Sequence, residues 1–338
     1  MTLLVLAGSV TLLVTGPWPL RVLGAIGLPM AYVLRPRFGR LAPGVTPLRR
    51  DEAPALYALA DRVAAAVGSR PVDVIVVGGD FNASYARYGV RNRSLLVLGL
   101  PLWAALTPQQ RIALLGHEFG HDVNGDSRRG RWLGSALWAL EEWHRMTLPD
   151  RSRSEGVDLV FFLAGTVQRL LMGGLNALVT GLYRALERLT VRSGQAAEYR
   201  ADALAAGVGG TAAVRGVLEV LLLHATAESV VLRRRNRPRP VRRTADGTAD
   251  GPDLWTELAE RIAAVPPSER ERRLRLSARE LGAVDATHPP THLRLRMLTT
   301  RPPVTEPSVT ADPAQQGAVE AELAPHRVKI AEELRQQE

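Results

Sequence analysis

The chain has 338 residues, 46% of them hydrophobic, so it is long enough to bury one substantial core together with appendages. It contains no cysteine, which excludes disulfides and thiolate metal sites and leaves nitrogen and oxygen as the ligands for any metal ion. The net charge of +9 comes almost wholly from arginine and suits an anionic surface. We expect lipid headgroups rather than nucleic acid as this partner, because no nucleic-acid-binding motif is visible.

The N-terminal segment holds two apolar runs, residues 3–15 and 20–34, separated by a Gly-Pro-Trp-Pro turn. A full membrane crossing needs about 20 residues, so each run is short and the two together predict a tight hairpin or a kinked pair. We therefore predict residues 1–34 as a retained anchor in the cell membrane, with one or two passes; a buried hydrophobic hairpin is the alternative. By the positive-inside rule, the arginines that follow place the next domain in the cytoplasm. They are Arg35, Arg37, Arg40, Arg49 and Arg50.

Residues 51–67 have the apolar spacing of an amphipathic helix, which Gly68 ends. Three short stretches follow, at 72–77, 81–88 and 94–98, and turn signals with glycine and asparagine separate them. These stretches predict a small β-sheet.

Residues 107–126, TPQQRIALLGHEFGHDVNGD, predict a helix with Thr107 as its N-cap in a capping box. His117 and His121 stand four residues apart, which places both imidazoles on one helix face, close enough to hold one zinc ion. With Glu118 they form the H-E-x-x-H motif, whose glutamate takes a proton from the attacking water and passes it to the leaving amine. The alternative is a chance recurrence of this short pattern.

Two helical stretches follow this motif. Residues 132–143 are rich in tryptophan and could lie at a membrane interface. Residues 157–185 are strongly apolar, broken only by Gln168 and Arg169, and both membrane insertion and core burial stay open for them. We expect a membrane-associated helical insertion at about residues 132–185.

Residues 195–207, QAAEYRADALAAG, predict a further helix, with Glu198 and Asp202 four residues apart on one face. Glu198 can be the third protein ligand of a zinc ion whose fourth position is left for water, which gives one Zn²⁺ per chain. Asp202 can accept a hydrogen bond from the outer nitrogen of a ligating histidine and so fix its tautomer. A solvated surface pair is the alternative, although the many flanking alanines suit a tightly packed helix.

The rest of the chain is more polar. Residues 233–253 are basic and proline-rich and predict a flexible loop, either a solvated linker or a segment lying on anionic lipid. Residues 254–265 and 268–281 have helical spacing. Residues 299–338 predict a proline-rich linker and a polar terminal helix with little to anchor it.

Four motifs in order along the chain, FNASYA, HEFGH, EYRAD and THPPTHLR, together resemble the membrane zinc metallopeptidase family of HtpX-like heat-shock proteases and CAAX prenyl proteases. The resemblance covers roughly residues 51–298. It implies a mainly α fold of the gluzincin type with a small β-sheet, preceded by N-terminal membrane segments. It also implies that Glu118 is the catalytic base and that Asp202 is the aspartate beside the metal. The zinc ligands of the family match His117, His121 and Glu198.

Two further pairs of residues are candidates for the site, the first for binding substrate and the second for catalysis. Asn82 and Ser84 lie in the stretch before the zinc helix, where an extended substrate could add through main-chain hydrogen bonds; a turn asparagine after Asp80 is the alternative. His288 precedes two prolines and Arg294 follows in the next helical turn, and either could meet the charge of the oxyanion. The alternatives are a second metal pair made by His288 and His292, which the intervening prolines disfavour, and a structural bend with Arg294 on a surface carboxylate.

Taken together, these patterns favour a membrane-bound zinc endopeptidase. It would hydrolyse peptide bonds of proteins at the cytoplasmic face of the membrane, in protein quality control, with proteins or peptides as its substrates. One alternative is a regulatory or signalling metalloprotease that cleaves a specific partner. Another is a catalytically silent scaffold with the same fold, which would be expected to lack a ligand or the base, whereas all four residues are present.

Overall fold

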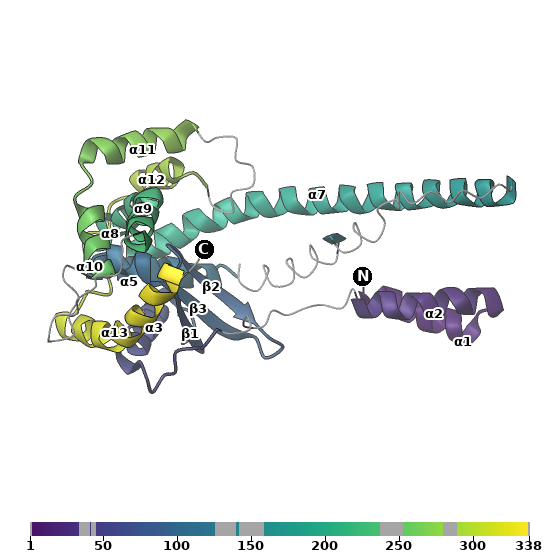
Figure 1. Cartoon of the computed structure of the whole chain (residues 1–338), viewed down its shortest axis with the longest axis horizontal. Coiled ribbons are helices and arrows are strands. Elements are labelled where there is room, and N and C mark those ends of the chain that lie inside the picture. The colour runs from purple at the N-terminus through teal and green to yellow at the C-terminus, as the bar shows by residue number, and fades with distance from the viewer. Residues whose placement is uncertain are drawn as a thin grey trace. The chain divides into compact units, whose positions relative to one another are not determined.

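The computed structural model of the chain describes residues 2–33, 41, 45–125, 140–141, 159–236, 253–279 and 289–336 (Figure 1). The chain divides into two compact units. One comprises Met1–Gly39 and Arg129–Arg192, and the other comprises Arg40–Arg128 and Ser193–Glu338.

The two apolar runs at the N-terminus form helices α1 (Thr2–Thr15) and α2 (Trp18–Val33), which pack against each other as the predicted hairpin (Figure 1). Gly27 of α2 faces Ser9 of α1, and a Cβ at this glycine would lie 2.1 Å from the Ser9 hydroxyl oxygen. The glycine therefore allows the close approach of the two helices. Within the described part of the chain, no helix is both long enough and apolar enough to cross a membrane.

Helix α7 runs without a break from Leu159 to Gly209. The sequence predicted two helices in this region, at 157–185 and 195–207, and their separation is wrong. The connecting residues contain no proline and a single glycine, Gly194, and an isolated glycine costs a helix only about 1 kcal/mol. Of the interfacial helix predicted at 132–143, only residues 140–141 are described, so that prediction is not tested.

The second unit contains a three-stranded sheet at the predicted positions, made of β1 (Val74–Gly78), β2 (Ala83–Tyr88) and β3 (Arg93–Gly99). β3 is central, parallel to β1 and antiparallel to β2, so β2 is an edge strand. Along β2 the buried side chains of Ala83, Tyr85 and Arg87 alternate with the exposed side chains of Ser84 and Ala86.

Helices α3 (Pro54–Val67), α4 (Leu100–Ala105), α5 (Pro108–Val123) and α8 (Thr211–Leu221) share one hydrophobic core with this sheet. The predicted capping box begins α5: the Thr107 hydroxyl accepts from the backbone N–H of Gln110, whose side chain accepts from the backbone N–H of Thr107. α5 then packs against α3, α8 and β2, which places it in the middle of the unit.

The remaining helices are α9 (His224–Arg235), α10 (Leu254–Ala263), α11 (Pro267–Arg279), α12 (Thr291–Thr299) and α13 (Pro313–Gln336). Helices α10 and α11 lie where the helical spacing predicted them. The predicted basic loop begins too early, because residues 233–235 still belong to α9. Residues 237–252 of that loop lie outside the described residues.

Helix α13 is anchored, contrary to the prediction for the terminal helix. Val319 and Leu323 are fully buried. The carboxylate of Glu322 accepts hydrogen bonds from the backbone N–H groups of Ala55 and Leu56, at 2.7 and 2.9 Å. These N–H groups in the first turn of α3 have no acceptor within the helix, so Glu322 caps its N-terminus. The prediction failed because a narrow apolar stripe is hard to recognise in a helix dominated by polar residues.

Candidate metal centre

The predicted metal ligands lie on two tightly packed helices. α5 carries His117 and His121, and the C-terminal part of α7 carries Glu198. A Cβ at Gly120 of α5 would lie 2.9 Å from the Cα of Ala201 on α7, so glycine is needed for the helices to come this close. This small-residue contact brings the carboxylate of Glu198 to the two imidazoles.

We expect Gly120→Ala to lower the affinity for zinc about 10- to 100-fold, the range typical of changes beside a metal site, because the added methyl group would push Ala201 and hence Glu198 away. Competition with a chromophoric chelator measures this affinity. Gly207→Ala is the matched control, since Gly207 lies on α7 with open space around its Cβ position. Equal zinc affinity of the two variants would contradict the prediction.

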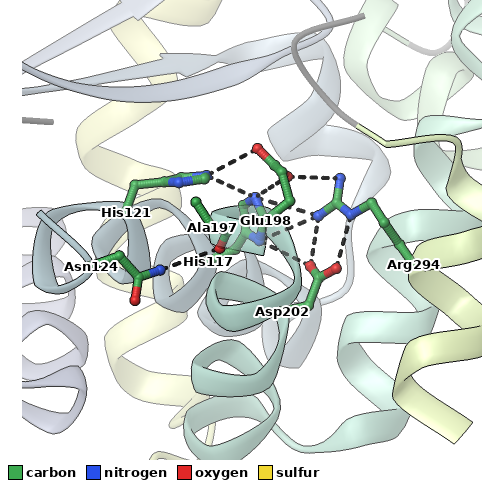
Figure 2. A network of polar contacts seen from close by, with 7 residues as sticks. All are labelled: His117, His121, Asn124, Ala197, Glu198, Asp202 and Arg294. Atoms are coloured by element: carbon green, nitrogen blue, oxygen red, sulfur yellow. Dashed lines mark hydrogen bonds and ion pairs between the residues drawn. The ribbon is translucent and has the colours of Figure 1, made fainter. Parts of the chain in front are cut away.

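The donor atoms of the three residues converge (Figure 2). His117 Nε2 lies 3.3 Å from His121 Nε2 and 3.5 Å from Glu198 Oε2, and His121 Nε2 lies 3.4 Å from Glu198 Oε1. Ligands placed about 2.0–2.1 Å from a tetrahedral zinc ion lie roughly 3.3–3.4 Å from one another. Both the spacing and the types of these donors therefore fit zinc, with the fourth coordination position left for water or substrate.

Asp202 holds His117 from the side away from the other two ligands. Its Oδ1 lies 3.0 Å from His117 Nδ1, so an Nδ1–H donated to Asp202 leaves the Nε2 lone pair facing His121 and Glu198 (Figure 2). This is the position predicted for an aspartate that fixes the tautomer of a ligand. At the end of α5, the side chain of Asn124 donates to the backbone carbonyl of Ala197 at 3.2 Å. This hydrogen bond is a further contact between α5 and α7, next to Glu198.

The surroundings of His117 favour a positive charge. Burial lowers the pKa of this imidazole, but hydrogen bonds to Asp202 and Glu198 outweigh burial and raise the pKa to about 9. Burial raises the pKa of Asp202, whereas hydrogen bonds from Arg294 and His117 bring the net pKa below its ordinary value. The two carboxylates therefore stabilise a cation at this place, whether a proton or a metal ion.

Arg294 of α12 reaches into the same network. Its Nε and Nη2 donate to the two oxygens of Asp202, at 2.9 and 2.6 Å, and its Nη1 lies 3.5 Å from Glu198 Oε2. The alternative of an arginine on a surface carboxylate is wrong, because Arg294 and both of its partners are buried. His288 lies outside the described residues, so its role stays a prediction.

We expect Arg294→Ala to lower kcat about 10²-fold while KM and zinc content are largely kept, as for a donor that acts mainly in the transition state. Arg294→Lys keeps the charge but cannot donate to both oxygens of Asp202 as the guanidinium does, so this variant should retain only part of the native rate. Steady-state kinetics and elemental analysis check both variants. Loss of zinc together with activity would instead assign the arginine to holding the ligands.

A pocket of about 230 Å³ opens beside His117 and Glu118. Glu118 is 7% exposed, and Asn82 and Ala83 line the pocket at the start of β2. The candidate base and the candidate substrate strand therefore border one space. Ser84 is not among the residues described as lining this pocket, and its side chain is on the exposed face of β2.

Sequence reasoning missed the part of the apolar pocket wall that comes from α8. Its members share one face of that helix: Val214, Val217, Leu218 and Leu221. Their spacing of three, one and three residues is that of an amphipathic helix, and this signal could have identified the face. It could not have shown that the face borders the candidate base.

Two imidazoles and a carboxylate on packed helices, with a further glutamate in the adjoining pocket, are the set of side chains that a zinc-dependent peptidase requires. A family model described as Peptidase family M48 matches residues 51–302, and the chain belongs to this family. This match confirms the family resemblance read from the four motifs. It spans the predicted site residues from Asn82 to Arg294.

Among solved structures, the crystal structure of S. mikatae Ste24p is similar to this chain, with a TM-score of 0.39 and 17% sequence identity. The similarity covers 87% of this chain and 62% of that one, so the chain spans less than two thirds of the length of that protein. No curated protein matches the chain.

Proposed function

We propose that the chain is a zinc-dependent endopeptidase with one Zn²⁺ per chain. The observation that carries this proposal is the convergence of His117, His121 and Glu198 at distances that suit a tetrahedral zinc ion, beside a pocket that Glu118 lines. Membership of Peptidase family M48 supports the same reaction.

Glu118 is the proposed general base. When bound, zinc would polarise the scissile carbonyl and make a water molecule more acidic. Glu118 takes a proton from the attacking water, whose oxygen bonds to the carbonyl carbon. The glutamate then gives this proton to the amide nitrogen as the carbon–nitrogen bond breaks, which yields a carboxyl group and an amine. Arg294, and His288 as predicted from the sequence, are the proposed donors to the oxyanion.

An extended peptide is the proposed form of the substrate. β2 is an edge strand, and an edge offers backbone groups for a further strand. Asn82 and Ala83, at the start of β2, line the pocket together with Glu118. A peptide paired with this edge would therefore pass the proposed base, and Asn82 would bind one of its peptide groups.

We further propose that the peptidase is bound to the cell membrane, with the catalytic unit in the cytoplasm, and degrades misfolded proteins there. Large apolar side chains at the surface of the α1–α2 hairpin support a lipid contact: Leu3, Val14 and Trp18 are 78%, 70% and 76% exposed. The arginines after the hairpin support the cytoplasmic side. Residues 1–34 would be the anchor and residues 51–298 the peptidase domain.

Removal of the metal tests the proposed reaction. The purified chain should cleave an unstructured protein such as casein, lose that activity in a zinc chelator, and regain it when Zn²⁺ is restored. The reason is that the bound ion is needed to activate the water and to polarise the scissile carbonyl. Product mass spectrometry should find new termini at internal peptide bonds. Unchanged cleavage in the chelator, at a verified loss of zinc, would contradict the proposal.

A further inference from the structure

An arginine is buried on the inward face of the edge strand β2. Arg87 is only 5% exposed and lies on the same face of the strand as the buried side chains of Ala83 and Tyr85. Arginine is rarely buried in this way unless a carboxylate pairs with it, since an uncompensated charge away from water is costly. Its partner therefore indicates which element β2 is attached to.

The partner is Asp122 of α5, the residue that follows the predicted ligand His121. Arg87 Nε donates to Asp122 Oδ1 at 2.7 Å and Arg87 Nη2 to Oδ2 at 2.5 Å, and the two side chains are 1% and 7% exposed. Ser69 donates to Asp122 Oδ2 at 2.9 Å and fixes that carboxylate further. The pair is thus a buried, bidentate ion pair that joins β2 to the C-terminal end of α5.

A second contact joins the same two elements. The rings of Tyr85 on β2 and Phe119 on α5 pack edge to face, with their centroids 5.5 Å apart. Arg87 lies four residues beyond Ala83, roughly 13 Å along the strand from the pocket. Two contacts at different points along the strand restrict its rotation relative to the helix.

We propose that Arg87 and Asp122 are positioning residues that hold β2 at a fixed distance from the metal ligands on α5. The inference rests on the proposed function, in which β2 binds the substrate and α5 supplies the metal site. Strand and ligands belong to different elements, so the scissile carbonyl meets the metal only if the two elements keep their spacing. A displacement of about 1 Å can cost 10²-fold in rate.

A purely structural ion pair makes a different prediction. Apolar residues of similar size often replace a buried ion pair without loss of stability, whereas the loss of one partner strands a charge. The test variant is therefore the double substitution Arg87→Met with Asp122→Leu. Arg87→Lys is a second variant that keeps the charge and loses the fork. The matched control is Arg234→Met with Glu257→Leu, which removes a mostly buried pair between α9 and α10.

The readout is the binding of two peptides of one sequence to the zinc-loaded protein, with Glu118→Gln present throughout to prevent cleavage. One peptide ends in a zinc-binding hydroxamate and the other in a plain amide. Where strand pairing and metal binding act together, the hydroxamate should bind about 10²-fold more tightly or better. We call the Arg87→Met/Asp122→Leu protein and the Arg87→Lys protein the clamp variants. We expect this ratio of Kd values to fall about tenfold in both clamp variants and to stay unchanged in the control, with the Kd of the amide peptide unaltered.

The possible results separate this inference from the proposed function. A large ratio in the parent protein that persists in the clamp variants would overturn the positioning role and leave the peptidase intact. Equal binding of the two peptides by the parent protein would overturn both. Loss of zinc from both clamp variants would assign the pair to holding His121 and overturn the positioning of β2.

Discussion

Glu118→Gln is expected to lower kcat for peptide cleavage by about 10²- to 10⁴-fold, the usual contribution of a general base, while zinc stays bound. Glutamine fills the same space in the pocket beside His117 but cannot take a proton from water. The residue is not one of the three converging ligands, so the metal should be held as before. Kinetics with a fluorogenic peptide and elemental analysis of zinc measure the two quantities.

Glu257→Gln is the control for this variant, because Glu257 is 8% exposed, against 7% for Glu118, and lies on α10, outside the pocket. It should cleave at the native rate. Cleavage at the native rate by Glu118→Gln would remove this residue as the base. Proteomics of cells with the native and the Glu118→Gln protein would then identify the substrates, which should accumulate uncut.

The sequence predicted those parts of the fold that depend on neighbouring residues. The capping box at Thr107 sets the start of α5, and the four-residue spacing of His117 and His121 sets their common face. The three strands were found from β-branched runs between turn signals. Glu198 was found because a zinc site needs a third ligand and the EYRAD motif offers one.

Other features depend on contacts between distant residues and could not be predicted in this way. Arg87 and Asp122 are 35 positions apart, and no sequence motif links the two residues. The carboxylate of Glu322 caps α3 from more than 260 positions away. Such partners are fixed by packing, whereas local patterns describe one element at a time.

The continuity of α7 shows a further limit of reading one element at a time. The apolar stretch and the EYRAD stretch differ in character, so they suggested two helices, yet the chain between them has no strong helix breaker. A change in composition marks a change of surroundings rather than the end of a helix. The alanines around Glu198 were the more useful signal, since they face the glycines of α5.

Glu198→Ala is expected to lower the affinity for zinc roughly 10²- to 10³-fold. Structural zinc sites bind with about 10–16 kcal/mol shared among four ligands, so one ligand contributes about 2.5–4 kcal/mol. The side chain of Glu198 lies within 3.5 Å of the donor nitrogens of both histidines. It is the one carboxylate in the group of three possible ligands found among the described residues. Chelator competition measures the affinity, and peptide cleavage should be lost at zinc concentrations that saturate the native protein.

The comparison with Glu118→Gln makes this result specific, because one variant should lose metal and activity together and the other activity alone. Glu228→Ala serves as the control, since its side chain is 58% exposed on α9, and it should bind zinc as the native protein does. Glu198→Gln keeps the shape of the ligand but not its charge, so its affinity should lie between those of the alanine variant and the native protein. If Glu198→Ala bound one zinc ion per chain with native affinity, the third ligand would have to be another residue, and α7 would hold the site only by packing.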